Sequence, residues 1–341
     1  MSTLIYEKSY ILTNNGYFII DELINKEDIF IWNGHEWKNI IIKINNNFNH
    51  DGLYKIILSD GCELLCSESH YLNIVKQNKE INNIKSIKVN DLLDNYTFPV
   101  IDGLETNNIL YPYTHGYYCG YFNKLDQKNN ELFFESNLIY INLINDKQKI
   151  KSEIEITGKY SINKEKTILT GLLKLDIDKT IKAPINGDIE NKLTWLSGLI
   201  DNNGFITKVQ DAKYLNISVL SKKFATEIKF LFNTIGINPY ISIKSDNRKY
   251  KLKSGEIHEV IKYYWIISLN ADDTNKMFFK SEFDLKIFYL EYDKSFYSID
   301  QNIDRYLSIK KISKLEIQKK SFIIENTNSL IINGVLIYNS N

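Results

Sequence analysis

The pattern of hydrophobic and polar residues changes twice along the chain. From Ser9 to about Asp102, short runs of β-branched and aromatic residues are separated by Asn-Asn-Gly, Asn-Gly and Asp-Gly. Such runs predict β-strands, and the turn residues between them are signals for hairpins. The same texture returns after about Ile309. Both ends of the chain therefore predict β structure.

The middle of the chain has helical spacing instead. The segments YPYTHGYYCGYF and LTWLSGLIDNNGFI place glycines in apolar runs, and SKKFATEIKFLFNTIG and FDLKIFYLEYDKSFYSI have helical periodicity. The strand-like runs KYLNISVL and YYWIISLN lie between them. We expect a mainly β domain made of residues 1–104 and 305–341, interrupted by an α+β domain of residues 105–304.

Composition narrows the function classes only slightly. The 341 residues hold 42 Lys plus Arg and 42 Asp plus Glu, a balance that neither favours nor excludes a nucleic-acid partner. The cysteines Cys62, Cys66 and Cys119 are too few for a disulfide framework and lack zinc spacing. No apolar run approaches the roughly 18 residues of a membrane span. We expect an intracellular monomer without a structural metal or a membrane partner.

The last residues, NGVLIYNSN, pose a question of their own. The apolar run from Val335 to Ile337 reads as a buried strand, yet it leads to an amide, Asn339, directly before a hydroxyl, Ser340. Chain ends are commonly frayed and polar, so a disordered tail is one interpretation. The other is a strand that holds Asn339 in place for chemistry.

Two segments of the middle resemble the paired helices of the LAGLIDADG homing endonucleases. The first is WLSGLIDNNG, which begins at Trp195 and contains Gly198. The second, YTHGYYCGYF, looks like a degenerate copy, with Gly116 and Gly120 at the packing positions. In that family small residues let the two helices pack backbone to backbone. The resemblance implies double-stranded DNA as a partner.

The catalytic positions of this resemblance lack their acids. In the family, the residue before the last glycine of each helix is an acid that holds Mg²⁺ against the scissile phosphates. Those positions are Asn203 and Tyr121 here, while Asp201, the other acid of the motif, usually serves the helix end. We therefore expect DNA cleavage to be lost, and Mg²⁺ to be required only if the domain is active.

The two ends resemble inteins, in which LAGLIDADG domains are often inserted. Three segments resemble the sequence blocks of inteins: YILTNNGYFIIDEL, DGCELLCSESHYLNI and SFIIENTNSLIINGVLIYNS. Together with the middle, they extend the resemblance over nearly the whole chain. The resemblance implies a β domain of the Hint type, shaped like a horseshoe with adjacent termini. It also implies that the partners are flanking segments of a host protein, called exteins. The element would then be found wherever the host protein is, and splicing would need no cofactor.

Roles for individual residues follow from the same resemblance. The Asn339 side-chain nitrogen would attack its own carbonyl, closing a succinimide and cutting the chain before Ser340, whose Oγ first receives the N-terminal host segment. The family's Thr-x-x-His is Ser67-x-x-His70 here. His70 would protonate the leaving nitrogen of the N-terminal scissile peptide, and Ser67 would hydrogen-bond the same peptide.

Two positions depart from the intein pattern. Counting back from Ile11 at the common spacing reaches Leu4, which has no nucleophilic atom, so Ser2, the nearest hydroxyl before it, is the candidate nucleophile with a longer lead-in. Tyr338 replaces the usual His before the terminal Asn. We therefore expect the cyclisation to be slow or to be assisted differently.

Two alternatives to a self-splicing element stay open. One is a free-standing, site-specific DNA endonuclease with an intein-like scaffold, which Met1 favours slightly and the missing acids disfavour. The other is a DNA-binding module that cuts nothing. The residues after Asn339 fit several host proteins, including the large subunit of ribonucleotide reductase, and do not choose among them.

Overall fold

The structure is a computed structural model, and it describes most of the chain. The described residues are 2–45, 52–74, 81–93, 96, 98–122, 133–135, 138–141, 159–163, 166–170, 181–209, 212–251, 256–269, 307–316 and 320–339. Side chains are described for fewer residues than the backbone. No helix in these ranges is long and apolar enough to cross a membrane.

The chain forms two compact units. Unit 1 contains Met1–Leu104, Ile228–Ser242 and Asp300–Asn341, and unit 2 contains Glu105–Glu227 and Ile243–Ile299. The sequence prediction placed all of residues 105–304 in one inserted domain, whereas residues 228–242 belong to unit 1. The second half of the helix at Lys222–Thr234 therefore packs with the two ends of the chain, as does the start of the strand at Tyr240–Lys251.

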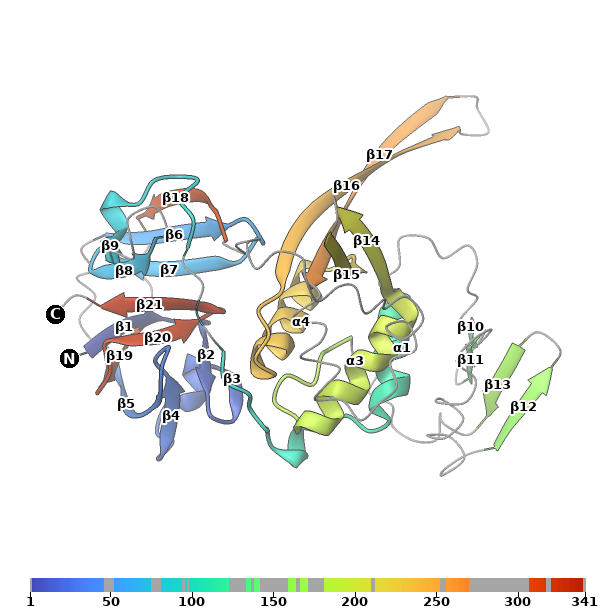
Figure 1. The fold of residues 1–341 in the computed structure, drawn as a ribbon, viewed down its shortest axis with the longest axis horizontal. Coiled ribbons are helices and arrows are strands. Elements are labelled where there is room, and N and C mark those ends of the chain that lie inside the picture. Colours follow the sequence, from blue (N-terminus) through green and yellow to red (C-terminus); the bar gives the residue numbers. More distant parts are fainter. Residues whose placement is uncertain are drawn as a thin grey trace. The chain divides into compact units, whose positions relative to one another are not determined.

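Unit 1 is built from antiparallel β-strands in two sheets. A ten-stranded sheet has the order β1-β19-β5-β4-β2-β20-β21-β8-β9, with β3 added to β2, and a three-stranded sheet has the order β18-β6-β7 (Figure 1). The strands are β1 (Ser2–Tyr6), β2 (Tyr10–Thr13), β3 (Gly16–Ile19), β4 (Ile29–Trp32), β5 (Trp37–Asn45), β6 (Leu53–Leu58), β7 (Glu63–Ser67), β8 (His70–Asn73), β9 (Ile81–Asn83), β18 (Ile309–Leu315), β19 (Ser321–Glu325), β20 (Ser329–Ile332) and β21 (Val335–Asn339). Short 3-10 helices cover Ile20–Leu23 and Ile84–Ser86.

Three hairpin turns predicted near the N-terminus are present, at Asn15-Gly16 between β2 and β3, Asn33-Gly34 between β4 and β5, and Asp60-Gly61 between β6 and β7. A further Asn-Gly turn joins β20 to β21. The turn between β20 and β21 has φ of 50° at Asn333 and 76° at Gly334. Two successive positive φ angles are what a type I′ turn requires, and Asn-Gly is the pair that adopts them at least cost. Asp60 and Gly61 likewise join β6 to β7, with φ of 75° at the glycine. The local signals thus fix where the strands reverse.

The ten-stranded sheet curls until its first strand meets its seventh. β1 is the first strand of the sheet and pairs with β19, yet it also contacts β7 and β21. The ends of the chain therefore lie close together, as Figure 1 shows by the labels N and C. This agrees with the expectation that both termini are adjacent in one β unit.

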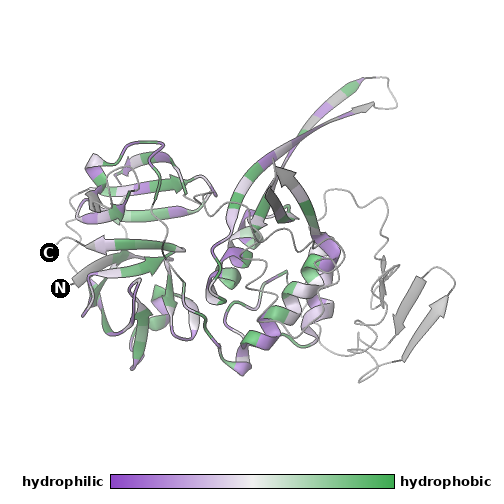
Figure 2. Ribbon diagram, in the orientation of Figure 1, coloured by the Kyte–Doolittle hydropathy of each residue, from purple (hydrophilic) through white to green (hydrophobic). Residues whose placement is uncertain are grey.

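The core of unit 1 is aliphatic. Residues of strands from both ends of the chain, such as Ile5, Ile11, Ile324 and Ile337, are completely buried in it. β20 and β21 are hydrophobic along much of their length (Figure 2), and β20 is buried at every position. Because apolar burial stabilises by about 25 cal/mol per Å², this core binds the two ends of the chain to each other.

Unit 2 contains a helix pair and two small antiparallel sheets. Its helices are α1 (Pro112–Phe122), α3 (Ile189–Asn203) and the first half of α4 (Lys222–Thr234), after a 3-10 helix at Glu105–Asn107. One sheet has the order β14-β15-β17-β16 and the other β10-β11-β13-β12. These strands are β10 (Phe133–Glu135), β11 (Leu138–Ile141), β12 (Lys159–Asn163), β13 (Lys166–Thr170), β14 (Gly204–Val209), β15 (Ala212–Val219), β16 (Tyr240–Lys251) and β17 (Ile257–Leu269). The helix predicted in FDLKIFYLEYDKSFYSI lies outside the described residues.

Helices α1 and α3 pack backbone to backbone at glycines. A Cβ placed on Gly116 would lie 2.0 Å from the carbonyl oxygen of Trp195, and one on Gly198 would lie 2.0 Å from the carbonyl oxygen of Tyr113. No real Cβ approaches an oxygen so closely, so any larger residue would force the helices apart. The predicted role of these glycines in close helix packing is confirmed.

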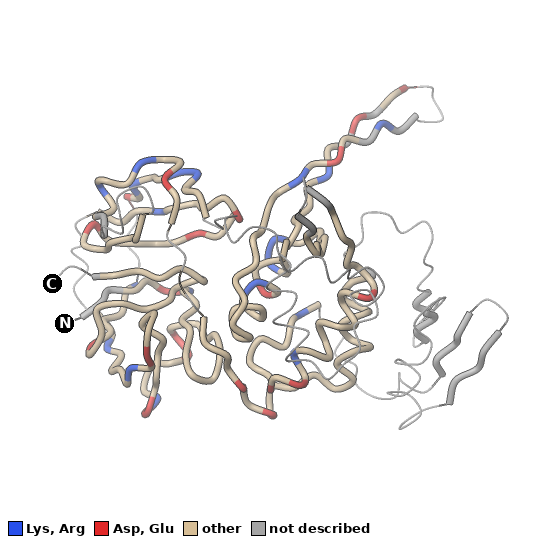
Figure 3. Tube along the Cα trace, viewed as in Figure 1, with Lys and Arg blue, Asp and Glu red and all other residues tan. Residues whose placement is uncertain are grey.

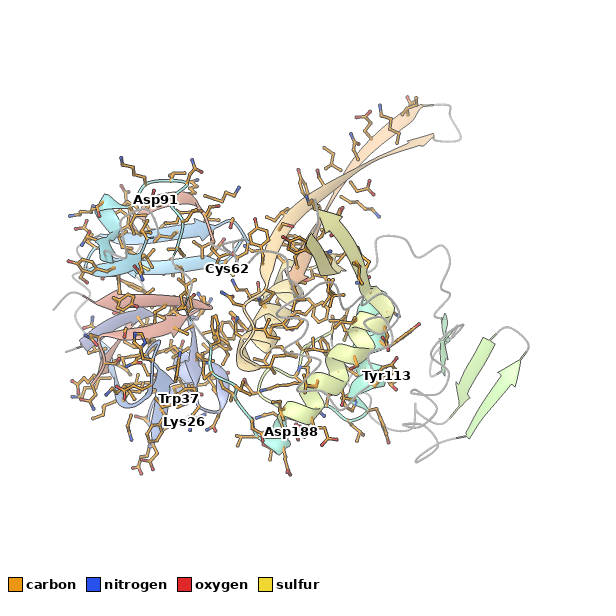
Figure 4. The ribbon with its side chains drawn as sticks, in the orientation of Figure 1. Lys26, Trp37, Cys62, Asp91, Tyr113 and Asp188 are labelled. Carbon is orange, nitrogen blue, oxygen red and sulfur yellow. The ribbon has the colours of Figure 1, made fainter. Side chains whose placement is uncertain are left out.

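The start of α3 is fixed by its sequence. Asp188, labelled in Figure 4, is the N-cap residue, and its Oδ1 accepts a hydrogen bond of 2.7 Å from the backbone N–H of Asn191. A capping carboxylate satisfies a helix N–H that has no partner within the helix and is favourable for the helix dipole.

Candidate functional site

Strand β21 brings the end of the chain against β8. The two strands pair in an antiparallel register that sets Asn339 opposite His70 and Tyr338 opposite Tyr71. Residues directly opposite in such a pair share one face of the sheet. On its other side β21 pairs with β20, where Tyr338 faces Ser329. The predicted cyclising residue and the predicted proton donor are thus neighbours, although the side chain of Asn339 and all of Ser340 lie outside the described residues.

His70 is completely buried and its ring is oriented by Ser67. The backbone N–H of Ser67 donates to Nδ1 of His70 at 2.9 Å, and the Ser67 Oγ lies 2.9 Å from the same nitrogen. A nitrogen that accepts from an amide N–H carries no proton, so the neutral imidazole holds its proton on Nε2. Nε2 is therefore the atom of this ring that can deliver a proton to a leaving group.

Ser69 is a member of this group that the sequence reasoning missed. Its Oγ lies 2.6 Å from the Oγ of Ser67. The hydroxyl of Ser67 is therefore shared between Ser69 and Nδ1 of His70. The only signal in the sequence is the Ser-x-Ser-His spacing, which the comparison with Thr-x-x-His passed over. The predicted contact of Ser67 with a scissile peptide stays a prediction.

The turn that carries these residues is braced by Glu68. Its carboxylate accepts a hydrogen bond of 3.1 Å from the Tyr54 hydroxyl and forms an ion pair with Lys85. Asn83 Nδ2 donates to the Glu68 carbonyl oxygen at 2.6 Å. The hydrogen bond from Lys85, opposed by partial burial and helped by the hydroxyl of Tyr54, lowers the pKa of Glu68. The turn from β7 to β8 is thus held from three directions.

The N-terminal strand reaches the same region. β1 contacts β7, which ends at Ser67, and it contacts β21. Within β1, Ser2 is opposite Glu325 and Leu4 is opposite Ile323 on β19. Ser2 and Leu4 are two positions apart, and alternate positions of a strand share a face. The side chains of both residues lie outside the described part, so Ser2 as nucleophile stays a prediction.

Cys66 is not a competing nucleophile. Only 1% of its surface is exposed, and burial raises the pKa of its thiol to about 12. Since the thiolate is the reactive form of cysteine, this thiol is inert near neutral pH. The hydroxyls and the imidazole are left as the reactive groups around the β7–β8 turn.

The helix ends in unit 2 carry no metal site among the described residues. Asn203, the last residue of α3, uses its Nδ2 to donate to the carbonyl oxygen of Ser218 on β15. Asp201 accepts a hydrogen bond of 2.7 Å at Oδ2 from Tyr113, which is labelled on α1 in Figure 4. The Tyr121 side chain lies outside the described residues. Within the described ranges, no group of three or more His, Cys, Asp or Glu residues could hold a metal ion.

Comparison with known proteins finds that the chain is similar to part of a longer protein. No protein-family model matches the chain. The chain is similar to the ribonucleoside-diphosphate reductase large subunit of Invertebrate iridescent virus 6, with 25% identity over 264 residues. The alignment covers 73% of this chain and 26% of that protein. The chain therefore spans about a quarter of the length of its relative.

Among solved structures, the crystal structure of a mutant of an Ssp DnaB mini-intein variant is a match. It has 13% sequence identity and covers 31% of this chain and 65% of that one, with a TM-score of 0.23. At that score no correspondence of elements is drawn from the likeness.

Proposed function

We propose that the chain is a self-splicing protein element, an intein. One observation supports this above the others: the register of β21 and β8 sets Asn339 opposite the buried His70. The predicted strand NGVLIYNSN and the predicted Ser67-x-x-His70 motif come from opposite ends of the sequence. An ordinary frayed tail has no reason to pair with that motif.

In the proposed reaction, the C-terminal cut is an intramolecular cyclisation. The side-chain nitrogen of Asn339 attacks the carbonyl carbon of Asn339, a five-membered succinimide closes, and the peptide nitrogen of Ser340 leaves with a proton. The pairing of Asn339 with His70, next to Tyr338, which is paired on both sides, restricts the attacking residue before reaction. Such restriction contributes to rate because the ring closure loses little further freedom.

The proposed N-terminal steps use the hydroxyls. The Oγ of Ser2 attacks the carbonyl carbon of the residue before it, and the amide becomes an ester. The Nε2–H of His70 supplies the proton to the freed nitrogen, and the proton released by the Ser2 hydroxyl replaces it on the imidazole. The Oγ of Ser340 then takes the acyl group from Ser2 before Asn339 cyclises. Finally the free amine of Ser340 displaces its own ester to give a normal peptide bond between the flanks.

We further propose that the host is a ribonucleotide reductase large subunit. The similar viral protein carries that name, and only 26% of it is matched by this chain. An element inserted in a longer enzyme would give such partial coverage. The competing explanation is that the chain corresponds to a catalytic part of the reductase itself, in which case it would process no flanking protein.

For unit 2 we propose a LAGLIDADG-type scaffold without cleavage activity. The close contact of α1 with α3 at Gly116 and Gly198 supports the scaffold. Against cleavage, the amide of Asn203 donates to a carbonyl instead of presenting a carboxylate. The described part of the β16–β17 hairpin carries both basic and acidic residues (Figure 3).

The test places the chain between two reporter proteins and follows the masses of the products. Splicing joins the reporters, isolated cleavage releases one of them, and a part of a reductase leaves the fusion intact. Asn339→Ala removes the attacking nitrogen, so release of the C-terminal reporter should fall by several orders of magnitude.

Asn341→Ala is the matched control, because it removes a similar amide two positions further on and leaves Asn339 in place. Its release rate should stay near that of the parent. Release from the Asn339→Ala protein at the parental rate would refute the proposed function.

A further inference from the structure

Residues 228–242 lie in the middle of the sequence but in unit 1 of the structure. They comprise the second half of α4 and the segment that leads into β16. Lys229, on this half of α4, forms an ion pair with Asp60 in the β6–β7 turn, and both side chains are 0% exposed. The Oδ1 of Asp60 also accepts a hydrogen bond of 2.9 Å from the backbone N–H of Cys62.

The ion pair is charged in spite of its burial. Burial by itself would lower the pKa of Lys229, but the carboxylate of Asp60 raises it above its usual value. A buried charge is tolerated when an opposite charge and hydrogen bonds compensate for lost hydration, and removal of one partner leaves the other charge uncompensated. Removing either partner would therefore be strongly destabilising, and the pair holds this half of α4 against the β6–β7 turn.

Two further residues of α4 bind to β2 and β3. The ring of Phe230 stacks on that of Tyr17 with centroids 4.4 Å apart and packs against Tyr10 at 5.3 Å. The Tyr17 hydroxyl donates to Oδ1 of Asn233 at 3.3 Å. The Nδ2 of Asn233 donates to the Ile237 carbonyl oxygen at 3.0 Å.

These helix residues lie against the turn from which β21 starts. A Cβ placed on Gly334 would be 3.2 Å from the Oδ1 of Asn233, 3.4 Å from the Cε of Lys229 and 3.6 Å from the Cε1 of Phe230. The Tyr96 hydroxyl donates to the carbonyl oxygen of Gly334. The start of β21 is thus enclosed by α4, while its other end carries Asn339 opposite His70.

We infer that residues 228–242 are a positioning element for the C-terminal cut, with Lys229 as its anchoring residue through Asp60 and the Asn333–Gly334 turn. The inference rests on the proposed function for its chemistry. Its physical basis is that β21 pairs with β20 from Val335 to Tyr338 and with β8 at Tyr338 and Asn339, so that a displacement at its start is transmitted along the ladder to Asn339. A misplacement of about 1 Å can cost roughly a hundredfold in rate.

The experiment uses the full chain between two reporters and the variants Lys229→Met, Asp60→Asn with Lys229→Met, and Lys223→Met. The Lys223 side chain is 84% exposed on the same helix, which makes it the matched control. The double variant replaces the ion pair by neutral side chains of similar shape and keeps an oxygen that can accept from Cys62. Two quantities are measured: the rates of the N-terminal and C-terminal steps separately, with the N-terminal ester trapped by hydroxylamine, and the amide hydrogen exchange of β20 and β21.

Lys229→Met is expected to slow C-terminal release about tenfold or more, in line with a displaced reacting group, and to speed exchange in β20 and β21. The N-terminal step should change by less than about threefold, because β1 is held along its whole length by its pairing with β19 and only contacts β21 without pairing with it. The double variant should regain most of the C-terminal rate and the slow exchange, since neutral pairs commonly replace buried ion pairs at little cost. Lys223→Met should match the parent.

An unchanged C-terminal rate in Lys229→Met, or an equal loss in both steps without recovery in the double variant, would overturn the inference. If the parent itself releases neither reporter, the proposed function fails and the exchange data decide the positioning alone. Faster exchange of β20 and β21 in Lys229→Met but not in Lys223→Met then supports it, and equal exchange in both refutes it.

Discussion

Each unit brings two distant parts of the sequence into close contact, but the two contacts differ in what depends on them. In unit 1 the backbone pairing of β8 with β21 sets His70 opposite Asn339, two residues for which we propose chemistry. In unit 2 the contact between α1 and α3 joins backbones, at Gly116 and Gly198. The chemistry proposed at the first contact depends on the side chains of these two residues.

A backbone contact can persist after the functional groups around it have changed. The glycines hold the helices together whatever residue ends the helix, and here the end of α3 has Asn203, whose amide is taken up by the Ser218 carbonyl. A scaffold and its activity therefore have separate requirements in one sequence. The following predictions test that separation.

Replacing His70 by Ala tests the reactive side of the comparison and has the largest expected effect. Loss of a general acid typically costs about a hundredfold to ten-thousandfold in rate. We expect the N-terminal step to fall by that range, as measured by trapping the ester with hydroxylamine. Tyr71→Phe, next to His70 and half-buried, is the control and should leave the rate within about twofold, a change small against that loss. An unchanged rate in His70→Ala would mean that the buried imidazole only packs.

Replacing Gly198 by Ala tests the backbone side. The added methyl would overlap the Tyr113 carbonyl oxygen, so the helices must separate. The free energy of unfolding of unit 2 should therefore fall by at least about 3 kcal/mol, the upper end of the usual loss from overpacking. Thermal unfolding followed by circular dichroism gives this quantity. Ser197→Ala, the preceding position of α3, should cost less than about 1.5 kcal/mol.

The same Gly198→Ala protein separates the two units. The NMR signals of the His70 ring should stay where they are in the parent, since the Ser67 contacts that orient this ring lie in unit 1. A shift of those signals would show that the helix pair and the reactive site depend on each other.

Asn203→Asp restores an acid at the end of α3 and is expected to fail as a repair. The Asp carboxylate cannot donate to the Ser218 carbonyl and would face its oxygen, so we expect a loss of about 1–3 kcal/mol in stability and no DNA nicking with Mg²⁺. The loss should lessen as the pH falls, because a protonated carboxyl can donate again. Asn203→Ala should cost less than Asp at neutral pH; a more stable Asp variant would contradict this account.

The smallest expected effect concerns Glu68 and pH. Its pKa in the folded state is lowered by Lys85 and Tyr54 below its usual value of about 4.5. A lowered pKa means that the carboxylate stabilises the fold above the unfolded pKa and that this contribution is lost as the pH falls through the folded pKa. The unfolding temperatures of the parent and of Glu68→Gln should therefore differ at about pH 6 and converge as the pH falls through the lowered pKa.

Local features of the structure could be predicted from the sequence. The Asn-Gly and Asp-Gly turns of the N-terminal strands were predicted because positive φ angles favour these residues in any fold. The α1–α3 contact was expected from the resemblance of two glycine-containing segments to a known helix pair. Each of these signals is contained in one short segment of the sequence.

Long-range features could not be predicted in the same way. The buried pair of Asp60 and Lys229 joins residues that share no local pattern, and a lysine in a helix is ordinarily solvated. The register of His70 against Asn339 depends on strand pairing across the whole chain, which periodicity does not set. For this reason residues 228–242 were assigned to the inserted domain, although they pack with unit 1.

The Asn333–Gly334 turn also bears on the chemical ageing of the protein. An asparagine followed by glycine is prone to deamidation, because the glycine nitrogen can attack the asparagine side-chain carbonyl. Here the Oδ1 of Asn333 accepts from the Tyr10 N–H at 2.9 Å, and its Nδ2 donates to the Glu63 carbonyl oxygen at 2.8 Å. These two hydrogen bonds hold the side chain in place, so we expect the folded protein to deamidate slowly at Asn333 by loss of its side-chain amide. The same hairpin thus protects one asparagine, Asn333, and presents another, Asn339, for the proposed cleavage.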